Sequence, residues 1–199
     1  GYRLQSTGEV VANCHKLPAR QFDRELLSLY TMQADFENTL ALLQQFNPNL
    51  QVLLTVSPVR HIKETIETNS VSKALLRVLC HQMTERHTKV SYFPAFEIMM
   101  DDLRDYRFYE ADMIHPNEVA QQYIWQQFTT AYFAEETLAF IKKWGKVQKA
   151  LHHKPFHPKS PAHQKFLQQT IKQLQGLNDT INVEQEIKIL RKQLSPTTG

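Results

Sequence analysis

Hydrophobic positions in the first two thirds of the chain alternate between short apolar runs and longer stretches with helical spacing. The clearest run, Leu50–Val56, is continuous, which is typical of a strand buried on both faces of a parallel sheet. Shorter β-prone segments cover 8–12 and 89–93. Helical spacing predicts helices over 20–29, 35–46, 70–86 and 116–133. Strands that alternate with helices favour an α/β fold with a parallel sheet.

The pattern changes near residue 136 to helices with one narrow apolar stripe each. A first helix is expected over 136–151. Ser160 is expected to cap a second helix that ends at Gly176, and Asn182 to start a third. Such stripes suit an antiparallel hairpin or a partner helix. We therefore predict an α/β domain over 1–135 and a basic helical extension over 136–199, through which the protein could form a homo-oligomer.

The net charge of +3 conceals an asymmetry that supports this division. Residues 1–140 carry 12 basic and 17 acidic residues, whereas residues 141–199 carry 11 basic and 3 acidic ones, a net of +8. The chain is 42% hydrophobic, as a globular protein is, and no apolar run reaches the ~20 residues of a membrane helix. The two cysteines cannot form a disulfide framework, so a reducing, cytoplasmic setting is expected. Glycine-rich nucleotide loops are absent, and no cofactor is expected.

Candidate catalytic and binding residues lie at the carboxyl ends of the predicted strands and just before one predicted helix. In open α/β sheets ligands bind at these strand ends, which here are 13–16, 57–61 and the loop after 89–93. At the helix entrance, Asp112 lies three residues before His115, so its carboxylate can reach the imidazole and fix its tautomer. The positive end of the following helix would keep His115 neutral and basic near pH 7. That suits a general base, although the spacing alone also fits a capping histidine.

Four sequence stretches in this order resemble the GSCFA-domain family of bacterial proteins, which is grouped with the SGNH (GDSL-like) hydrolases. They are Val10–Pro18, Thr55–His61, Asp102–Tyr109 and Asp112–Pro116. The resemblance covers about residues 2 to 130 and leaves the basic helical tail outside it. It implies that the first domain is the C-terminal part of an SGNH-like three-layer αβα sandwich.

The same resemblance implies a catalytic site. SGNH hydrolases use a Ser-His-Asp triad in which a D-x-x-H pair supplies Asp112 and His115. An asparagine usually helps to stabilise the oxyanion, and Asn13 is the candidate here. The G-S-C-F-A stretch, which should carry the nucleophilic serine, is missing from these residues and is expected before Tyr2. The implied activity is hydrolysis of an acyl or carbohydrate ester, with this chain inactive alone.

Three residues after the main predicted strand are candidates for substrate binding. Ser57 is a poor nucleophile because Pro58 lacks the backbone N–H that would help to form an oxyanion hole. We expect Ser57 to cap the loop that presents Arg60 and His61, which could bind an anionic or carbonyl group of the substrate. A salt bridge from Arg60 to the acidic cluster 101–105 is the alternative.

Other functions remain open from the sequence. Four histidines at 152, 153, 157 and 163 have irregular spacing without a nearby carboxylate or cysteine, so no metal site is predicted. The basic helices could instead make the chain a non-catalytic protein that binds nucleic acid or another anionic partner. Few aromatic residues are available there for base stacking, which argues against nucleic acid. A pseudoenzyme that binds a sugar or acyl ligand is a further alternative.

Overall fold

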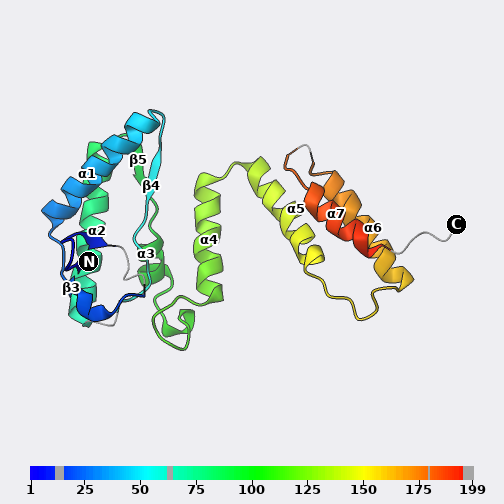
Figure 1. Cartoon of the computed structure of the whole chain (residues 1–199), viewed down its shortest axis with the longest axis horizontal. Helices are drawn as coiled ribbons and strands as arrows, with labels where there is room; N and C mark the ends of the chain where they lie inside the picture. Colours follow the sequence, from blue (N-terminus) through cyan, green and yellow to red (C-terminus); the bar gives the residue numbers. More distant parts are fainter. Residues whose placement is uncertain (12–15, 62–64, 179, 195–199) are drawn as a thin grey trace. The chain divides into compact units, whose positions relative to one another are not determined.

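The computed structural model describes residues 1–11, 16–61, 65–178 and 180–194. The chain forms two compact units, Gly1–Phe128 and Thr129–Gly199. The first is mixed α/β and the second is helical, which confirms the predicted fold class (Figure 1). Among the helices within the described ranges, none has the length and apolar content that crossing a bilayer requires.

Two parallel strands form the sheet that the apolar runs predicted. β4 (Val52–Leu54) pairs with β5 (Val90–Tyr92), and Leu54 lies opposite Tyr92. The backbone N–H of Phe93 continues the pairing by donating to the carbonyl of Leu54 at 2.8 Å. Because the strands are parallel, their carboxyl ends open at the same edge, where the 57–61 loop begins.

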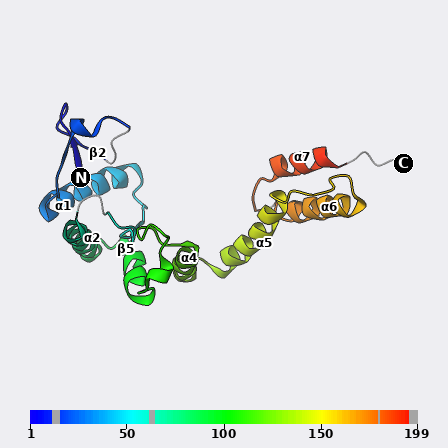
Figure 2. The same ribbon diagram turned by 90° about the horizontal axis from the view of Figure 1, so that it is seen from below.

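Two long helices cover one face of this strand pair. They are α1 (Leu29–Phe46) and α2 (Ile66–Arg86). Their shared core contains Leu40, Met83 and the strand residue Val90, and Met83 has no exposed surface. In Figures 1 and 2, α4 (Glu118–Tyr132) lies on the side of β5 away from α2. The core of α1, α2 and the strands therefore holds the sheet edge in place.

The chain before α1 folds differently from the sequence prediction. It forms a separate antiparallel sheet of order β2-β1-β3, made of β1 (Tyr2–Leu4), β2 (Val10–Val11) and β3 (Phe22–Arg24). The helix predicted over 20–29 is wrong, since only a 3-10 turn (η1, Ala19–Gln21) precedes β3. Phe22 is buried opposite Leu4 of β1. This pairing joins residues far apart in the sequence, so local helical spacing gives no sign of it.

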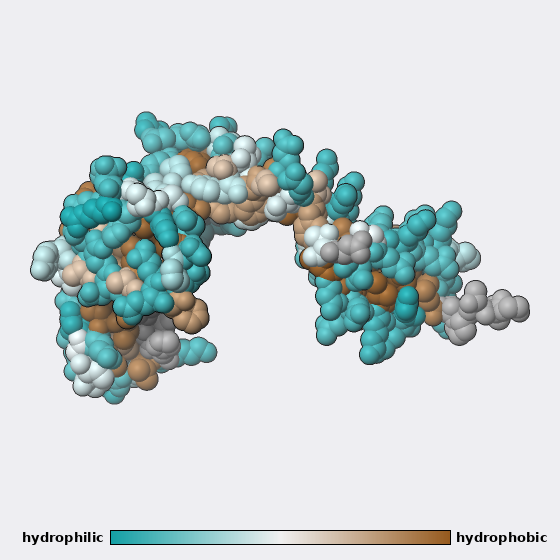
Figure 3. Space-filling view, turned by 90° about the horizontal axis from the view of Figure 1, so that it is seen from above, coloured by the Kyte–Doolittle hydropathy of each residue, from teal (hydrophilic) through white to brown (hydrophobic). Residues whose placement is uncertain are grey.

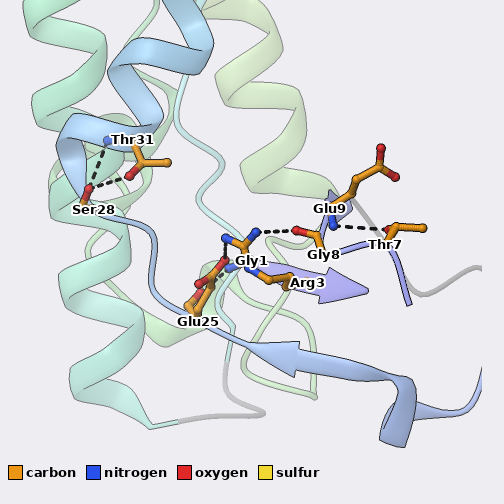
Figure 4. A network of polar contacts seen from close by, with 8 residues as sticks. All are labelled: Gly1, Arg3, Thr7, Gly8, Glu9, Glu25, Ser28 and Thr31. Atoms are coloured by element: carbon orange, nitrogen blue, oxygen red, sulfur yellow. Dashed lines mark hydrogen bonds and ion pairs between the residues drawn. The ribbon is translucent and has the colours of Figure 1, made fainter. Parts of the chain in front are cut away.

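Figure 4 shows polar contacts within the small sheet and a separate group at the start of α1. The guanidinium of Arg3 donates to the carbonyl of Gly8 in the turn before β2 and forms an ion pair with Glu25 after β3. Ser28 then caps α1, because its hydroxyl accepts a hydrogen bond from the backbone N–H of Thr31 at 3.1 Å. This cap explains why α1 begins at 29, six residues before the helix predicted over 35–46.

A second hydrophobic cluster lies between the end of β5 and α4. Short helical turns occupy this stretch: α3 (Ala95–Glu97), a π-helix (η2, Ile98–Asp102) and a 3-10 turn (η3, Tyr106–Phe108). Met99 and the α4 residue Ala120 are almost fully buried within the cluster. This cluster thus anchors the short helical turns after β5 to α4.

The helical unit has its own core. It contains α5 (Glu135–Leu151), α6 (Pro161–Gln175) and α7 (Glu184–Gln193), and α6 and α7 lie side by side as a hairpin (Figure 1). In Figure 3 the hydrophobic surface of this unit is a band among hydrophilic side chains. The buried residues of the core are Val147, Leu167, Ile171, Leu174, Leu177, Val183 and Leu190. The apolar stripes therefore pack against one another.

The predicted cap of α6 is confirmed and gives a test of this unit. The hydroxyl of Ser160 accepts a hydrogen bond from the backbone N–H of His163 at 3.2 Å. Ser160→Ala should lower the free energy of unfolding by about 1 kcal/mol, whereas Ser160→Asp, which keeps an acceptor, should be nearly neutral. Urea unfolding followed by Trp144 fluorescence in a Trp125→Phe background measures both variants. Equal losses for both would contradict the capping role.

Candidate active site

The loop before α4 is held in a fixed shape by its own backbone. Tyr109 and Pro116 form an antiparallel bridge, and the N–H of Glu110 donates to the carbonyl of His115 at 2.8 Å. Met113 at the tip has a φ of 58°, in the left-handed region that a non-glycine residue seldom adopts. The loop thus turns sharply between the two residues that the sequence singled out.

Asp112 and His115 contact each other as their spacing predicted. The Oδ2 atom of Asp112 lies 2.7 Å from Nδ1 of His115. Its Oδ1 atom accepts hydrogen bonds from the backbone N–H groups of Ile114, at 2.8 Å, and His115, at 3.0 Å. Both carboxylate oxygens are therefore engaged, and the side chain has a single orientation relative to the imidazole.

The hydrogen bond from His115, followed by those from the two backbone N–H groups, lowers the pKa of Asp112 to about 2. The carboxylate is ionised at neutral pH and can only accept, so Nδ1 of the neutral imidazole carries the proton. The lone pair then lies on Nε2. The His115 side chain is 57% exposed, so its ring is open to an incoming group.

His115 lies just before α4 rather than in its first turn. Asn117 starts the helix, since its Oδ1 accepts from the N–H of Ala120 at 3.1 Å and its Nδ2 donates to the carbonyl of Arg107 at 2.7 Å. Glu118 is the first helical residue. The expected influence of the helix on the charge of His115 stays a prediction.

Arg60 connects the loop after β4 to the Asp112–His115 loop. Its Nη1 atom donates to the carbonyl of Met113 at 3.2 Å, and its backbone N–H donates to the carbonyl of Ile114 at 3.4 Å. The guanidinium lies over the rings of Tyr109, at 4.3 Å from the centroid, and Tyr106, at 5.3 Å. Through these cation–π contacts and hydrogen bonds, Arg60 fixes the position of the loop that contains Asp112 and His115.

The acidic cluster after the π-helix has other partners. Asp101 forms an ion pair with Arg104 and Asp105 with Arg107, while Asp102 accepts a hydrogen bond from the hydroxyl of Tyr123. Among the described contacts, Arg60 therefore takes aromatic and carbonyl partners rather than the salt bridge considered above.

The other predicted site residues, Ser57, His61 and Asn13, have different surroundings. Ser57 closes a turn, because its Oγ accepts from the N–H of Val59 at 3.2 Å. The backbone N–H of His61 donates to Oδ1 of Asn69 at 2.9 Å, and His61 is exposed. Asn13 lies outside the described residues. Because β2 belongs to the antiparallel sheet, its end does not share the edge formed by β4 and β5, which corrects the sheet-edge argument for residues 13–16.

An apolar groove of about 480 Å³ adjoins His115. Its walls include Val59 from the loop after β4, Phe93 from the end of β5, and Ile124 and Trp125 from α4. The sequence analysis did not assign Trp125 to the site. The sequence could have indicated that Trp125 lies near the site. It belongs to the apolar face of a helix that begins shortly after the D-x-x-H pair.

Two of the four histidines of the 152–163 segment pack with an aromatic ring. The ring centroid of Phe166 lies 5.3 Å from that of His153 and 5.9 Å from that of His163. Within the described parts of the chain, no group of three or more histidine, cysteine or acidic side chains is arranged to hold a metal ion.

Comparison with known proteins gives two family matches. The GSCFA family model matches residues 1–128, and the model of the GSCFA domain protein, C-terminal domain, matches residues 144–196. Searches of curated proteins and of solved structures find no match. The second match corrects the expectation that the helical tail lies outside the resemblance, because that tail has a family model of its own.

Proposed function

Because this chain belongs to the GSCFA family, we propose that it carries the histidine–aspartate part of an ester hydrolase of the SGNH kind. The observation that carries the proposal is the 2.7 Å contact between Nδ1 of His115 and Oδ2 of Asp112. The resemblance to SGNH hydrolases supplies the reaction, and the contact gives the geometry that this reaction needs.

In the proposed reaction, Nε2 of His115 takes the proton of a serine hydroxyl as the serine oxygen attacks the ester carbonyl. The imidazolium that forms is stabilised by the ionised Asp112 carboxylate. His115 then returns the proton to the departing alcohol, which leaves an acyl-serine. Water attacks the acyl-serine with His115 again as base, and the released acid and free serine complete the cycle.

The serine in this proposal is supplied by a segment outside residues 1–199. Ser57 is unsuitable because it closes its own turn and precedes a proline, as described above. The apolar groove beside His115 supports an ester substrate, since its wall can contact the hydrocarbon part of an acyl group.

The test compares this chain with a longer protein that also carries a G-S-C-F-A-like stretch. The longer protein should hydrolyse short-chain aryl esters and should be labelled on that serine by a fluorophosphonate probe. Residues 1–199 alone should neither hydrolyse the ester nor react with the probe. Hydrolysis by residues 1–199 alone would overturn the assignment of the serine. Binding of a substrate analogue by the longer protein without any turnover would favour the pseudoenzyme.

A further inference from the structure

A second cavity adjoins the Asp112–Met113 turn, and its lining shares Pro58 with the apolar groove. It has a volume of about 580 Å³ and is bounded by the 57–61 loop, the first half of α2 and the turn itself. Its lining differs in chemistry from the groove, since its described residues include Arg60, Lys73 and Arg77 and, as the one carboxylate among them, Asp112. Positive charge therefore predominates at its wall.

Lys73 is the unusual member of this lining. It is only 4% exposed, yet it is a lysine, a residue type that is rarely buried without a partner of opposite charge. Its Nζ donates to the carbonyl of Ser57 at 2.6 Å. An ammonium group has three N–H donors, so this neutral acceptor satisfies one of them. Burial lowers the pKa of Lys73.

The other charged groups leave this excess in place. Arg77 is neutralised by Glu97, with Nε and Oε1 2.6 Å apart. Both oxygens of Asp112 are engaged by His115 and the backbone. Asn69 accepts the His61 N–H through its Oδ1 atom, so its amide N–H₂ end is left to donate. Lys73, Arg60 and Asn69 thus present donors to one cavity.

We propose that this cavity binds a carboxylate or phosphate group of a small ligand, with Nζ of Lys73 as the ion-pair partner. An anionic oxygen there would satisfy a remaining N–H of Lys73 and compensate its buried charge. The proposal depends on the cavity lining alone and is independent of the hydrolase proposal.

The competing explanation is that Lys73 only fixes the 57–61 loop. Lys89 provides a matched comparison, because its Nζ donates to the carbonyl of Pro48 at 2.6 Å and it is not part of this cavity lining. A purely structural lysine should affect stability and not the binding of anions. Lys73→Met and Lys89→Met, which both remove the charge and keep an unbranched side chain one atom shorter than lysine, separate the two explanations.

The methionines provide a local readout of binding to the 199-residue chain. Met100 and Met113 line the cavity, whereas Met32 and Met83 lie in the α1–α2 core. With ¹³C-methyl methionine labelling, succinate or inorganic phosphate should shift the signals of Met100 and Met113 saturably and leave those of Met32 and Met83 unchanged. Succinamide, the neutral analogue of succinate, should cause no such shift. The succinate and phosphate titrations show which anion is preferred.

Lys73→Met should weaken this binding by at least about tenfold, which corresponds to losing one charged hydrogen bond. Lys73→Arg and Lys89→Met should retain it. The proposal is overturned by the absence of a saturable shift at Met100 and Met113, by equal shifts with succinamide, or by unchanged affinity in Lys73→Met. If Lys73→Met loses the native Met83 signal, the contrast between succinate and succinamide in the unmodified chain decides.

Discussion

Asp112→Asn should lower kcat for ester hydrolysis by about 10³–10⁴-fold in the longer, serine-containing protein. In the present structure Oδ1 of Asp112 accepts two backbone hydrogen bonds. An asparagine would keep its carbonyl oxygen in that place, which turns its N–H₂ group toward Nδ1 of His115. Nδ1 must then accept, so the ring proton moves to Nε2. His115 could no longer take the serine proton, although the loop would keep its shape.

Steady-state kinetics on an aryl ester measure this effect, and His115→Ala should reduce kcat at least as much. A second histidine–carboxylate pair gives the control, since Nε2 of His87 lies 2.7 Å from Oε2 of Glu37. Glu37→Gln should leave kcat unchanged. With a pKa of about 2, Asp112 stays ionised throughout pH 4–8, so any acid loss of wild-type activity in that range reports another group. A rate for Asp112→Asn within tenfold of wild type would exclude the proposed role of Asp112.

The elements that the sequence predicted well are those that depend on residues close together in the chain. The continuous apolar run at 50–56 contains β4, and the 70–86 and 116–133 patterns contain most of α2 and α4. The contact between Asp112 and His115 was predictable for the same reason, because three residues of loop bring the two side chains together.

The features that were missed depend on residues distant in the sequence. β3 replaces the first half of the helix predicted over 20–29 because β1, about twenty residues earlier, offers backbone partners. Arg60 was expected near carboxylates or substrate, and it contacts Met113, which is 53 residues away. Lys73 was not singled out because its burial depends on how the 57–61 loop folds over α2. The spacing of residues in a single sequence does not indicate which distant segments will contact each other.

Leu174→Ala should destabilise the helical unit by about 2–5 kcal/mol, the range for removing a buried leucine side chain. Leu174 has no exposed surface and packs among residues of all three helices, including Val147 of α5 and Leu190 of α7. Units of this size have total stabilities of about 4–10 kcal/mol, so the substitution should remove a large part of that stability. Urea unfolding followed by Trp144 fluorescence, in the Trp125→Phe background, measures the change.

Ile189→Ala is the matched control for this substitution. Ile189 is an aliphatic residue of the same unit, but 56% of its surface is exposed on α7. Its truncation should change the free energy of unfolding by no more than about 0.5 kcal/mol. An effect at 174 as small as the one at 189 would contradict the packing of Leu174 in this core. A large difference would show that the apolar stripes of the basic helices are used within the unit, which leaves their charged faces for any partner.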